Sequence, residues 1–464
     1  MERTDKMDDG VIYEFTGNPF VDAGIWALSQ WVGKKPEELD KEDLRKAAED
    51  IFDTVYSNDK WYRSIIHGMV FPNGKFSNPG DFKKTSQERK SKAMDHFNGL
   101  IHEVTPLKDQ GSCIACGRRD IKRRFFKSEV PLTGSGKMLN YFSFASGGAD
   151  YCSACALAIQ FSPLLMYKCG DLLLFHSDSN SLMKVWSKNV IRKLKGKSLS
   201  GCFNEGYKNV KNALFHIIGF ILEERTIREV SNYESSITFY HFKNFNQGAN
   251  LDIYYFPSNV YNFLSEILRN ENYGDWLRIV KRGYKYVDWD NVKEEGEYKN
   301  NPNRVYNNLL DGKSIIRFFI DRKKKEAIGG WDLITNYLEE VLNMDEKRIN
   351  AIKNVADGLA DYIETTDDMK TLTKLETASN YKNYRNILRI IIKKRIESGI
   401  EDTLFSFDDY VNYLFPEGNL TWRETQDLIL FRIYEKLQPW IIEQGKQDEI
   451  LTASEMEEEM QEEE

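Results

Sequence analysis

Two pairs of cysteines constrain this chain of 464 residues more than any other feature. Two residues separate Cys113 from Cys116, and two separate Cys152 from Cys155. This spacing lets both thiolates of a pair reach one tetrahedral ion, and Gly117 permits the tight turn after the first pair. Four thiolates fill the coordination shell of Zn²⁺ and leave no position for a catalytic water. The pattern therefore predicts a structural zinc site, with four free buried thiols as the alternative.

The composition is that of a globular protein with more than one domain. Hydrophobic residues make up 41% of the chain and aromatic residues 13%, which is enough for a packed core. A length of 464 residues exceeds a single ordinary core and indicates two or three domains. The charged start MERTDKMDDG does not have the order of a signal peptide, and the most apolar stretch, residues 214–222, is about half of a bilayer span. We expect a cytoplasmic protein that does not enter a membrane.

The residue pattern changes character along the chain. Short β-like runs at 139–145, 172–176 and 251–256 alternate with helical intervals, whereas amphipathic helical patterns dominate after residue 330. The sequence thus predicts an α+β fold, in which an N-terminal mixed α/β region with an inserted four-cysteine zinc-binding motif is followed by a C-terminal α-helical bundle. The expected boundaries are 1–330 for the first domain, about 110–160 for the zinc finger within it, 331–454 for the bundle and 455–464 for an acidic disordered tail.

The acidic net charge comes mostly from the C-terminal tail. Its ten residues hold seven Glu, and removing these seven charges takes the formal net charge from −8 to −1. The body of the protein is therefore nearly neutral, and its basic residues are free to gather into separate clusters. Such segregation is how a protein forms an electrostatic track for nucleic acid.

Several clusters of basic residues are present. The first follows the first cysteine pair, includes two phenylalanines, and comprises Arg118, Arg119, Lys122, Arg123, Arg124 and Lys127. A second, at residues 188–197, contains Lys193 and Lys195. A zinc knuckle that presents a basic loop with aromatic rings suits contact with phosphates and stacking on bases. A solvated protein surface would have the same composition.

A further basic cluster falls on one face of a predicted C-terminal helix. Lys382, Arg385, Arg389 and Lys393 follow one another at spacings of three, four and four residues, which aligns them along the helix. The helix is expected to be buried on one side and to line a nucleic-acid path on the other, although an ordinary amphipathic surface helix gives the same pattern.

Familiar catalytic motifs are missing from the sequence. There is no P-loop, no GxGxxG after a strand, no HExxH, no GxSxG, and the six histidines are scattered singly. These absences favour a protein that is not an enzyme. The abundant carboxylates leave open an alternative, a zinc-containing nucleic-acid-processing enzyme with an unrecognised active site.

Three stretches together resemble a known family. They are GNPFVDAGIWAL near the N-terminus, the CxxCG and CxxC knuckles, and YHFKNFNQGANLDIYYFPSNV at 240–260. They are similar to the large subunit of type I-B CRISPR Cascade complexes, in the Tneap/Cst-type branch. The resemblance covers most of residues 10–270, and its most specific element is TGNPFVDAG.

The resemblance implies a non-catalytic subunit. It would bind the 5′ handle of the guide RNA, recognise the protospacer-adjacent motif in target double-stranded DNA, aid duplex opening and recruit the helicase-nuclease. Its other implied partners are the backbone, handle-binding and small subunits of Cascade. In such complexes guide pairing carries most sequence information, and the protein reads only the short adjacent motif and the nucleic-acid backbone.

Four further residues lie in the stretches that carry the resemblance. Asn18 offers an amide for a base edge and Phe20 a ring for a base step, but Asn18 before a proline also fits a helix cap. Asn246 and Gln247 offer amides that suit adenine or acceptors in a groove, and they also fit the satisfaction of a loop backbone. Both interpretations remain open at the level of sequence.

Overall fold

The chain divides into two compact units, residues 1–258 and residues 259–464, in the computed structural model. The structure describes residues 15–102, 112–118, 121, 123–133, 148–196, 206–224, 235–245, 248–270, 272–399 and 402–443. Among these residues, no helix is both long and apolar enough to cross a bilayer. The predicted strand at 139–145 and the acidic tail at 455–464 lie outside the described residues.

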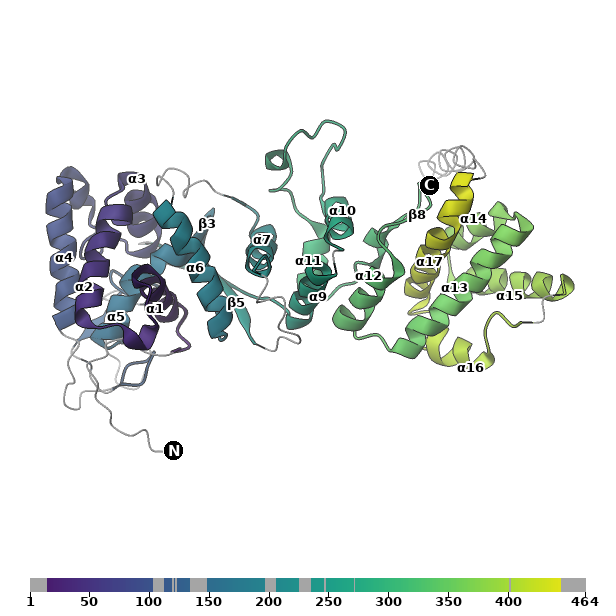
Figure 1. The fold of residues 1–464 in the computed structure, drawn as a ribbon, viewed down its shortest axis with the longest axis horizontal. Helices are drawn as coiled ribbons and strands as arrows, with labels where there is room; N and C mark the ends of the chain where they lie inside the picture. The colour runs from purple at the N-terminus through teal and green to yellow at the C-terminus, as the bar shows by residue number, and fades with distance from the viewer. Residues whose placement is uncertain are drawn as a thin grey trace. The chain divides into compact units, whose positions relative to one another are not determined.

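The first unit combines helices with an antiparallel sheet (Figure 1). Its helices are α1 (Pro19–Val32), α2 (Lys41–Ile51), α3 (Asp59–Trp61), α4 (Ser86–His102), α5 (Ser153–Phe161), α6 (Asn180–Gly196) and α7 (Val210–Leu222). Two π-helical segments, Phe52–Tyr56 and Tyr62–Val70, extend α2 and α3. The strands are β1 (Arg124–Phe125), β2 (Ala149–Asp150), β3 (Met166–Cys169), β4 (Asp171–Ser177), β5 (Ile237–Phe245) and β6 (Gly248–Tyr255).

The sheet of four strands has the order β3-β4-β5-β6, and each neighbouring pair is antiparallel. Strand β4 reads as a continuous apolar run because both of its faces are covered. Two consecutive side chains of β4 contact different helices. His176 lies against Asp22 of α1, and the Phe175 ring packs against Trp186 of α6. The sheet thus joins segments that are far apart in the sequence.

The TGNPFVDAG motif forms the start of α1. Asn18 caps the helix by accepting hydrogen bonds from the backbone N–H groups of Phe20 and Val21, both at 3.2 Å. Pro19 occupies the first helical turn, where its missing N–H costs nothing. The buried carboxylate of Asp22 accepts from the backbone N–H of Thr16 at 2.8 Å and from that of Gly17 at 3.0 Å. The motif is therefore a closed network of local hydrogen bonds.

Gly24 of the same motif sets how closely α1 approaches α5. A Cβ atom added at Gly24 would lie 1.8 Å from the backbone oxygen of Ala158. No side chain fits in that space, so the two helix backbones touch directly at this point. The last glycine of TGNPFVDAG thereby positions the helix that carries the second cysteine pair.

The second unit is mostly helical, with one small antiparallel pair of strands, β7 (Ile320–Asp321) and β8 (Glu326–Ala327). Its helices are α9 (Ser258–Arg269), α10 (Tyr273–Gly283), α11 (Arg304–Leu310), α12 (Trp331–Asn336), α13 (Glu346–Thr366), α14 (Met369–Thr377), α15 (Tyr381–Glu397), α16 (Phe407–Asp409) and α17 (Trp422–Glu443). Helices α13 and α17 pack side by side (Figure 1). Helix α13 buries an apolar stripe formed by Ile352, Val355, Leu359 and Ile363.

The two compact units divide at residue 258, whereas the sequence pattern changes at about residue 330. Tyr337 supplies the physical reason. Its ring packs on Phe263 of α9 with centroids 5.6 Å apart, and its hydroxyl accepts a hydrogen bond from the backbone N–H of Ile315 at 3.0 Å. Burial raises the pKa of Tyr337 to about 12, so this hydroxyl stays protonated. Residues 259–330 therefore share a core with the helices that follow them.

The predicted fold class is confirmed. An N-terminal region of mixed α/β structure contains a cluster of four cysteines, and a helical region follows towards the C-terminus. The predicted strand at 172–176 lies in β4, and the predicted strand at 251–256 overlaps β6.

We predict that Gly24→Ala destabilises the protein by about 3 kcal/mol, because the added methyl group must force apart two helix backbones that cannot reshape to accept it. Denaturant unfolding measures the change in the free energy of unfolding. Gly99→Ala in α4 is the matched control, since a Cβ atom there meets nothing within 4 Å. It should leave stability unchanged or raise it by up to about 1 kcal/mol. Equal effects of the two substitutions would contradict the close contact.

Candidate metal centre

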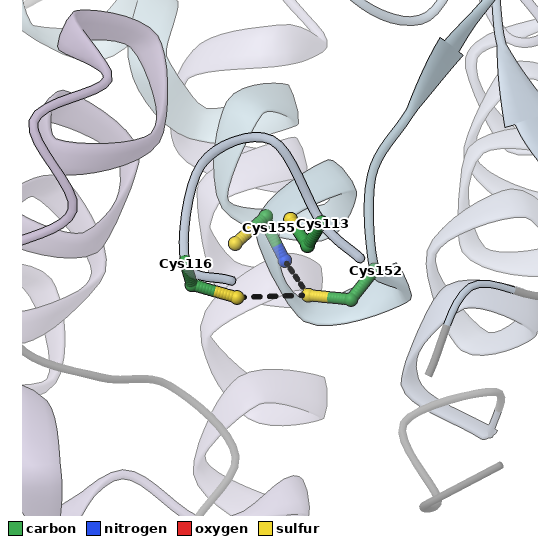
Figure 2. A group of neighbouring side chains, drawn as sticks. All are labelled: Cys113, Cys116, Cys152 and Cys155. Atoms are coloured by element: carbon green, nitrogen blue, oxygen red, sulfur yellow. Dashed lines mark hydrogen bonds between the residues drawn. The ribbon is translucent and has the colours of Figure 1, made fainter. Parts of the chain in front are cut away.

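The four cysteines predicted to bind a metal converge in the first unit (Figure 2). All four Sγ atoms of Cys113, Cys116, Cys152 and Cys155 lie within 4.8 Å of one another, and three of the four residues are buried. Figure 2 shows the first pair on a tight loop and the second pair at the start of α5. The two pairs are separated in sequence, so only the fold could bring them together.

The loop of the first pair is shaped by its own backbone hydrogen bonds. The N–H of Gly117 donates to the Cys113 carbonyl at 2.8 Å, and the N–H of Cys113 donates to the Arg118 carbonyl at 2.8 Å. Gly117 has a φ of +75°, a left-handed conformation that glycine adopts without steric cost. The N–H of Ile114 donates to the carbonyl of Asp150 at 2.9 Å, which fastens the loop to β2.

The second pair uses the first turn of α5. Cys152 is the N-cap residue of the helix, and its Sγ accepts a hydrogen bond from the backbone N–H of Cys155 at 3.4 Å. The N-terminus of a helix carries a partial positive charge that stabilises a thiolate. The helix start therefore supplies both the geometry and part of the charge that a metal-binding thiolate needs.

The four thiols titrate as one group because they are close together. The pKa of the Cys113 thiol is held far below its usual range, since Cys116, Cys152 and Cys155 donate hydrogen bonds to its thiolate. The pKa values of Cys152 and Cys155 are raised, first by their hydrogen bonds with Cys113 and then by burial. A cation would displace the remaining protons and compensate the buried negative charge.

The donor set fits a tetrahedral metal ion. A Zn–S distance of about 2.3 Å in a regular tetrahedron separates the sulfur atoms by about 3.8 Å. The Sγ atoms of Cys116 and Cys152 are 3.7 Å apart. Four sulfur ligands bind soft or borderline cations and leave no open position for substrate. The cluster thus has the chemistry of a structural metal site.

Asn18 connects this centre to the TGNPFVDAG motif. Its side-chain amide donates to the hydroxyl of Tyr151 at 3.1 Å, and Tyr151 directly precedes Cys152. Burial raises the pKa of Tyr151 to about 12 and keeps this hydroxyl protonated. The Asn18 oxygen is occupied by the cap, so both ends of the amide are engaged inside the protein. The cap interpretation of Asn18 therefore describes this structure.

Phe20, the predicted wedge for a base step, lies in the core with 7% of its surface exposed. Its ring packs edge-on against Phe242 of β5 with centroids 5.1 Å apart. A ring in this position cannot reach a base unless the core opens. In this position burial of the apolar ring stabilises the core, and the wedge role of Phe20 stays a prediction that requires the ring to leave the core.

Two arginines of the first basic cluster have acidic partners. Both guanidinium nitrogens of Arg123 donate to Glu129, at 3.0 and 2.7 Å, and Glu129 is 2% exposed. Nε of Arg124 lies 3.1 Å from Asp150, which is also its cross-strand neighbour in β2. These two ion pairs stabilise the fold around the four cysteines, and the role of Arg123 and Arg124 as phosphate ligands stays a prediction.

The other residues of this cluster and of the 240–260 stretch are placed only in part. Arg118 and Lys127 are half-buried beside the centre. Arg119, Lys122, Asn246 and Gln247 lie outside the described residues.

The lysines predicted on α6 lie against aromatic side chains. Nζ of Lys193 is 3.7 Å from the centroid of the Phe220 ring. Nζ of Lys195 donates to the carbonyl of Trp31 at 2.7 Å and lies 4.8 Å from that residue's ring centroid. Both residues remain exposed, so they carry positive charge on the surface while they stabilise the packing of α6.

The basic face predicted on α15 is exposed along its whole length: Lys382, Arg385, Arg389 and Lys393 are all solvent-accessible, and the residues Tyr384, Leu388 and Ile391 of the opposite face are buried. Lys393 forms an ion pair with Glu397 at 3.6 Å between two exposed side chains. Such a pair contributes little and exchanges readily. This face belongs to the second unit, so it is not part of the metal centre.

Sequence reasoning missed the residues that support the centre. Tyr151, Glu129 and Asn244 each hold a segment near the cysteines; the amide of Asn244 donates to the carbonyls of Val70 at 2.7 Å and Lys127 at 3.0 Å. Only Tyr151 had a local signal, its position next to Cys152. The roles of Glu129 and Asn244 depend on contacts across the fold.

Comparison with known proteins finds one similarity, in residues 107–167. This segment matches the family model described as CRISPR-associated protein (Cas_CXXC_CXXC). The matched segment contains all four cysteines, and the match supports a CRISPR-associated protein. No curated protein and no solved structure matches the chain.

We predict that Cys155→Ser lowers the bound metal from about one equivalent per chain to a small fraction, because a serine hydroxyl is not a thiolate ligand. Elemental analysis of the purified protein measures the metal, and thermal unfolding should show a lower midpoint. Cys169→Ala is the matched control, since Cys169 is buried in β3 and is not part of the cluster. Full retention of metal by the Cys155→Ser protein would contradict a four-thiolate site.

Proposed function

We propose that this protein is the non-catalytic large subunit of a type I-B CRISPR RNA-guided surveillance complex of the Cascade type. The observation that carries this proposal is the match of residues 107–167 to a family of CRISPR-associated proteins. The resemblance of residues 10–270 to large subunits supports the finer assignment. The metal centre agrees with it, because four thiolates provide a structural site without a catalytic position.

The proposed tasks are those of a subunit that holds nucleic acid and other proteins. They comprise binding of the guide RNA 5′ handle, recognition of the protospacer-adjacent motif, assistance in duplex opening and recruitment of the helicase-nuclease. The proposed partners also include the backbone, handle-binding and small subunits of the complex. The metal is proposed to be Zn²⁺, because four cysteine ligands in tetrahedral positions suit this ion best. We place the protein in the cytoplasm, where guide RNA and invading DNA meet.

The basic face of α15 is the proposed contact with a phosphate backbone. Lys382, Arg385, Arg389 and Lys393 lie on successive turns of one helix face, so they could contact successive phosphates of a strand. Lys382 and Arg389 form no ion pair among the described residues, so their charge is available to a ligand. Binding there depends on counterion release and carries no sequence information of its own.

Co-purification of the tagged protein with its genomic neighbours tests the proposal. A uniform guide-length RNA in a large particle, with about one zinc per chain, is the expected result. Incubation of the purified protein with labelled DNA and Mg²⁺ or Mn²⁺ tests the alternative, a zinc-containing nucleic-acid-processing enzyme. A lone monomer that cleaves DNA would overturn the proposed function in favour of that enzyme.

We predict that the double substitution Lys382→Gln, Arg389→Gln weakens nucleic-acid binding and lowers the slope of log K against log salt by about two, one for each lost phosphate contact. Fluorescence anisotropy over a series of salt concentrations measures both quantities. Lys46→Gln is the matched control, because Lys46 is exposed in the first unit and pairs with Glu42. An unchanged slope in the double variant would exclude α15 as a phosphate contact.

A further inference from the structure

A long arm connects α10 to α11 in the second unit, at residues 284–303 (Figure 1). Its two ends are joined at a neck by an antiparallel bridge between Tyr284 and Asn303 and by a hydrogen bond from the N–H of Lys285 to the carbonyl of Pro302 at 3.0 Å. Asn303 also caps α11 and donates to the carbonyl of Val280 at 2.9 Å. The neck is therefore fixed to both helices.

Tyr286 sits at this neck in an unfavourable state. Its φ is +58°, in the left-handed region that residues with a side chain rarely adopt. Its side chain is 88% exposed, more than any other large hydrophobic side chain among the described residues. The amide of Asn301 donates to the carbonyls of Lys285 at 3.1 Å and Tyr286 at 3.2 Å and holds this conformation in place.

Neither property of Tyr286 benefits the fold. A glycine would make the same turn without strain, and an exposed ring buries no apolar surface. Strained backbone that is held by surrounding hydrogen bonds gathers at functional sites. The ring is thus presented to solvent by a rigid support, which suits a contact with something outside the chain.

A small basic cleft lies beside the arm. It has a volume of about 260 Å³ and is lined by Arg278, Lys281, Arg282, Trp289, Asp321, Lys324, Glu326 and Ile328. Arg278 pairs with Glu326, and Arg282 pairs with Asp321 at 2.8 Å. Lys281 and Lys324 have no acidic partner within the described residues. The cleft therefore presents two uncompensated positive charges.

Trp289 links the cleft to the arm. Nζ of Lys281 lies 4.4 Å from its ring centroid, and the ring packs at 4.9 Å against Tyr298 farther along the arm. Tyr286 is three residues away from Trp289. The exposed Tyr286 ring of the arm is therefore close in sequence to a tryptophan that packs on Lys281 of α10, while Lys324 lies between β7 and β8. A ring and cations of this kind are what a stacked base and its phosphates require.

We infer that Tyr286 stacks on an unpaired base of a single nucleic-acid strand whose phosphates lie at Lys281 and Lys324. This inference rests on the proposed function, because it names a residue that handles the opened strand. Five carboxylates beyond Tyr286, at Asp288, Asp290, Glu294, Glu295 and Glu297, repel phosphates and confine the strand to the neck.

The test uses the full-length protein and a fluorescent single-stranded DNA oligonucleotide of mixed sequence. Tyr286→Ala should weaken binding by about 5- to 100-fold, the range for loss of one stacked base, and leave the salt slope unchanged. Tyr286→Phe should bind as the unmodified protein does. Lys281→Gln with Lys324→Gln should instead lower the salt slope by about two.

Two variants serve as controls for folding and for exposed rings. Tyr286→Gly removes the ring but relieves the strained φ, so it should lose affinity while its thermal midpoint is unchanged or raised. Tyr255→Ala removes a tyrosine that is 73% exposed in the first unit and should bind normally.

The outcomes separate the inference from the proposed function. If the unmodified protein binds no nucleic acid, the proposed function fails and the inference fails with it. If it binds and Tyr286→Ala binds equally well, only the inference is overturned. Unchanged DNA binding combined with loss of a co-purifying protein in Tyr286→Ala would overturn it as well, and would assign the ring to a protein contact.

Discussion

The direct backbone contact between α1 and α5 is the constraint on which the first unit depends. Gly24 allows the helices to touch at Ala158, and the Asn18 amide reaches Tyr151 just before the second cysteine pair. Both interactions come from one short motif and act on the helix that positions Cys152 and Cys155. A metal bound by the four thiols would fasten the start of the same helix. The TGNPFVDAG motif and the four cysteines thus both act on the start of α5.

Charge in this protein is divided between structural and available cations. Around the metal centre, Arg123 and Arg124 compensate the carboxylates of Glu129 and Asp150, so their charge is used within the fold. On α15 and in the cleft beside the arm at 284–303, basic side chains outnumber acidic ones. Since uncompensated charge releases counterions from nucleic acid, these surfaces of the second unit have the charge that contact with a phosphate backbone requires.

The four-cysteine cluster lies in the first unit, and the exposed basic surfaces of α15 and of the cleft beside the arm lie in the second. In the first unit the close contact between α1 and α5 fixes the helix that carries the second cysteine pair, and a metal bound by the four thiols would stabilise this arrangement further. In the second unit, a strained tyrosine lies on the arm at 284–303 and a row of cations lies on α15. Neither arrangement requires a catalytic group, in agreement with the proposal of a binding subunit.

The sequence by itself determined the local features: the cysteine spacing, the helical period of α13 and the basic face of α15. Each of these features depends on residues within a few positions of one another, and for such residues periodicity and spacing predict the local geometry. Only the tertiary structure decided that Phe20 is buried, that Glu129 neutralises Arg123, and that residues 259–330 share a core through Tyr337. These outcomes depend on partners distant in the chain, because burial and pairing are set by which surfaces meet, and a single sequence does not encode that in any local pattern.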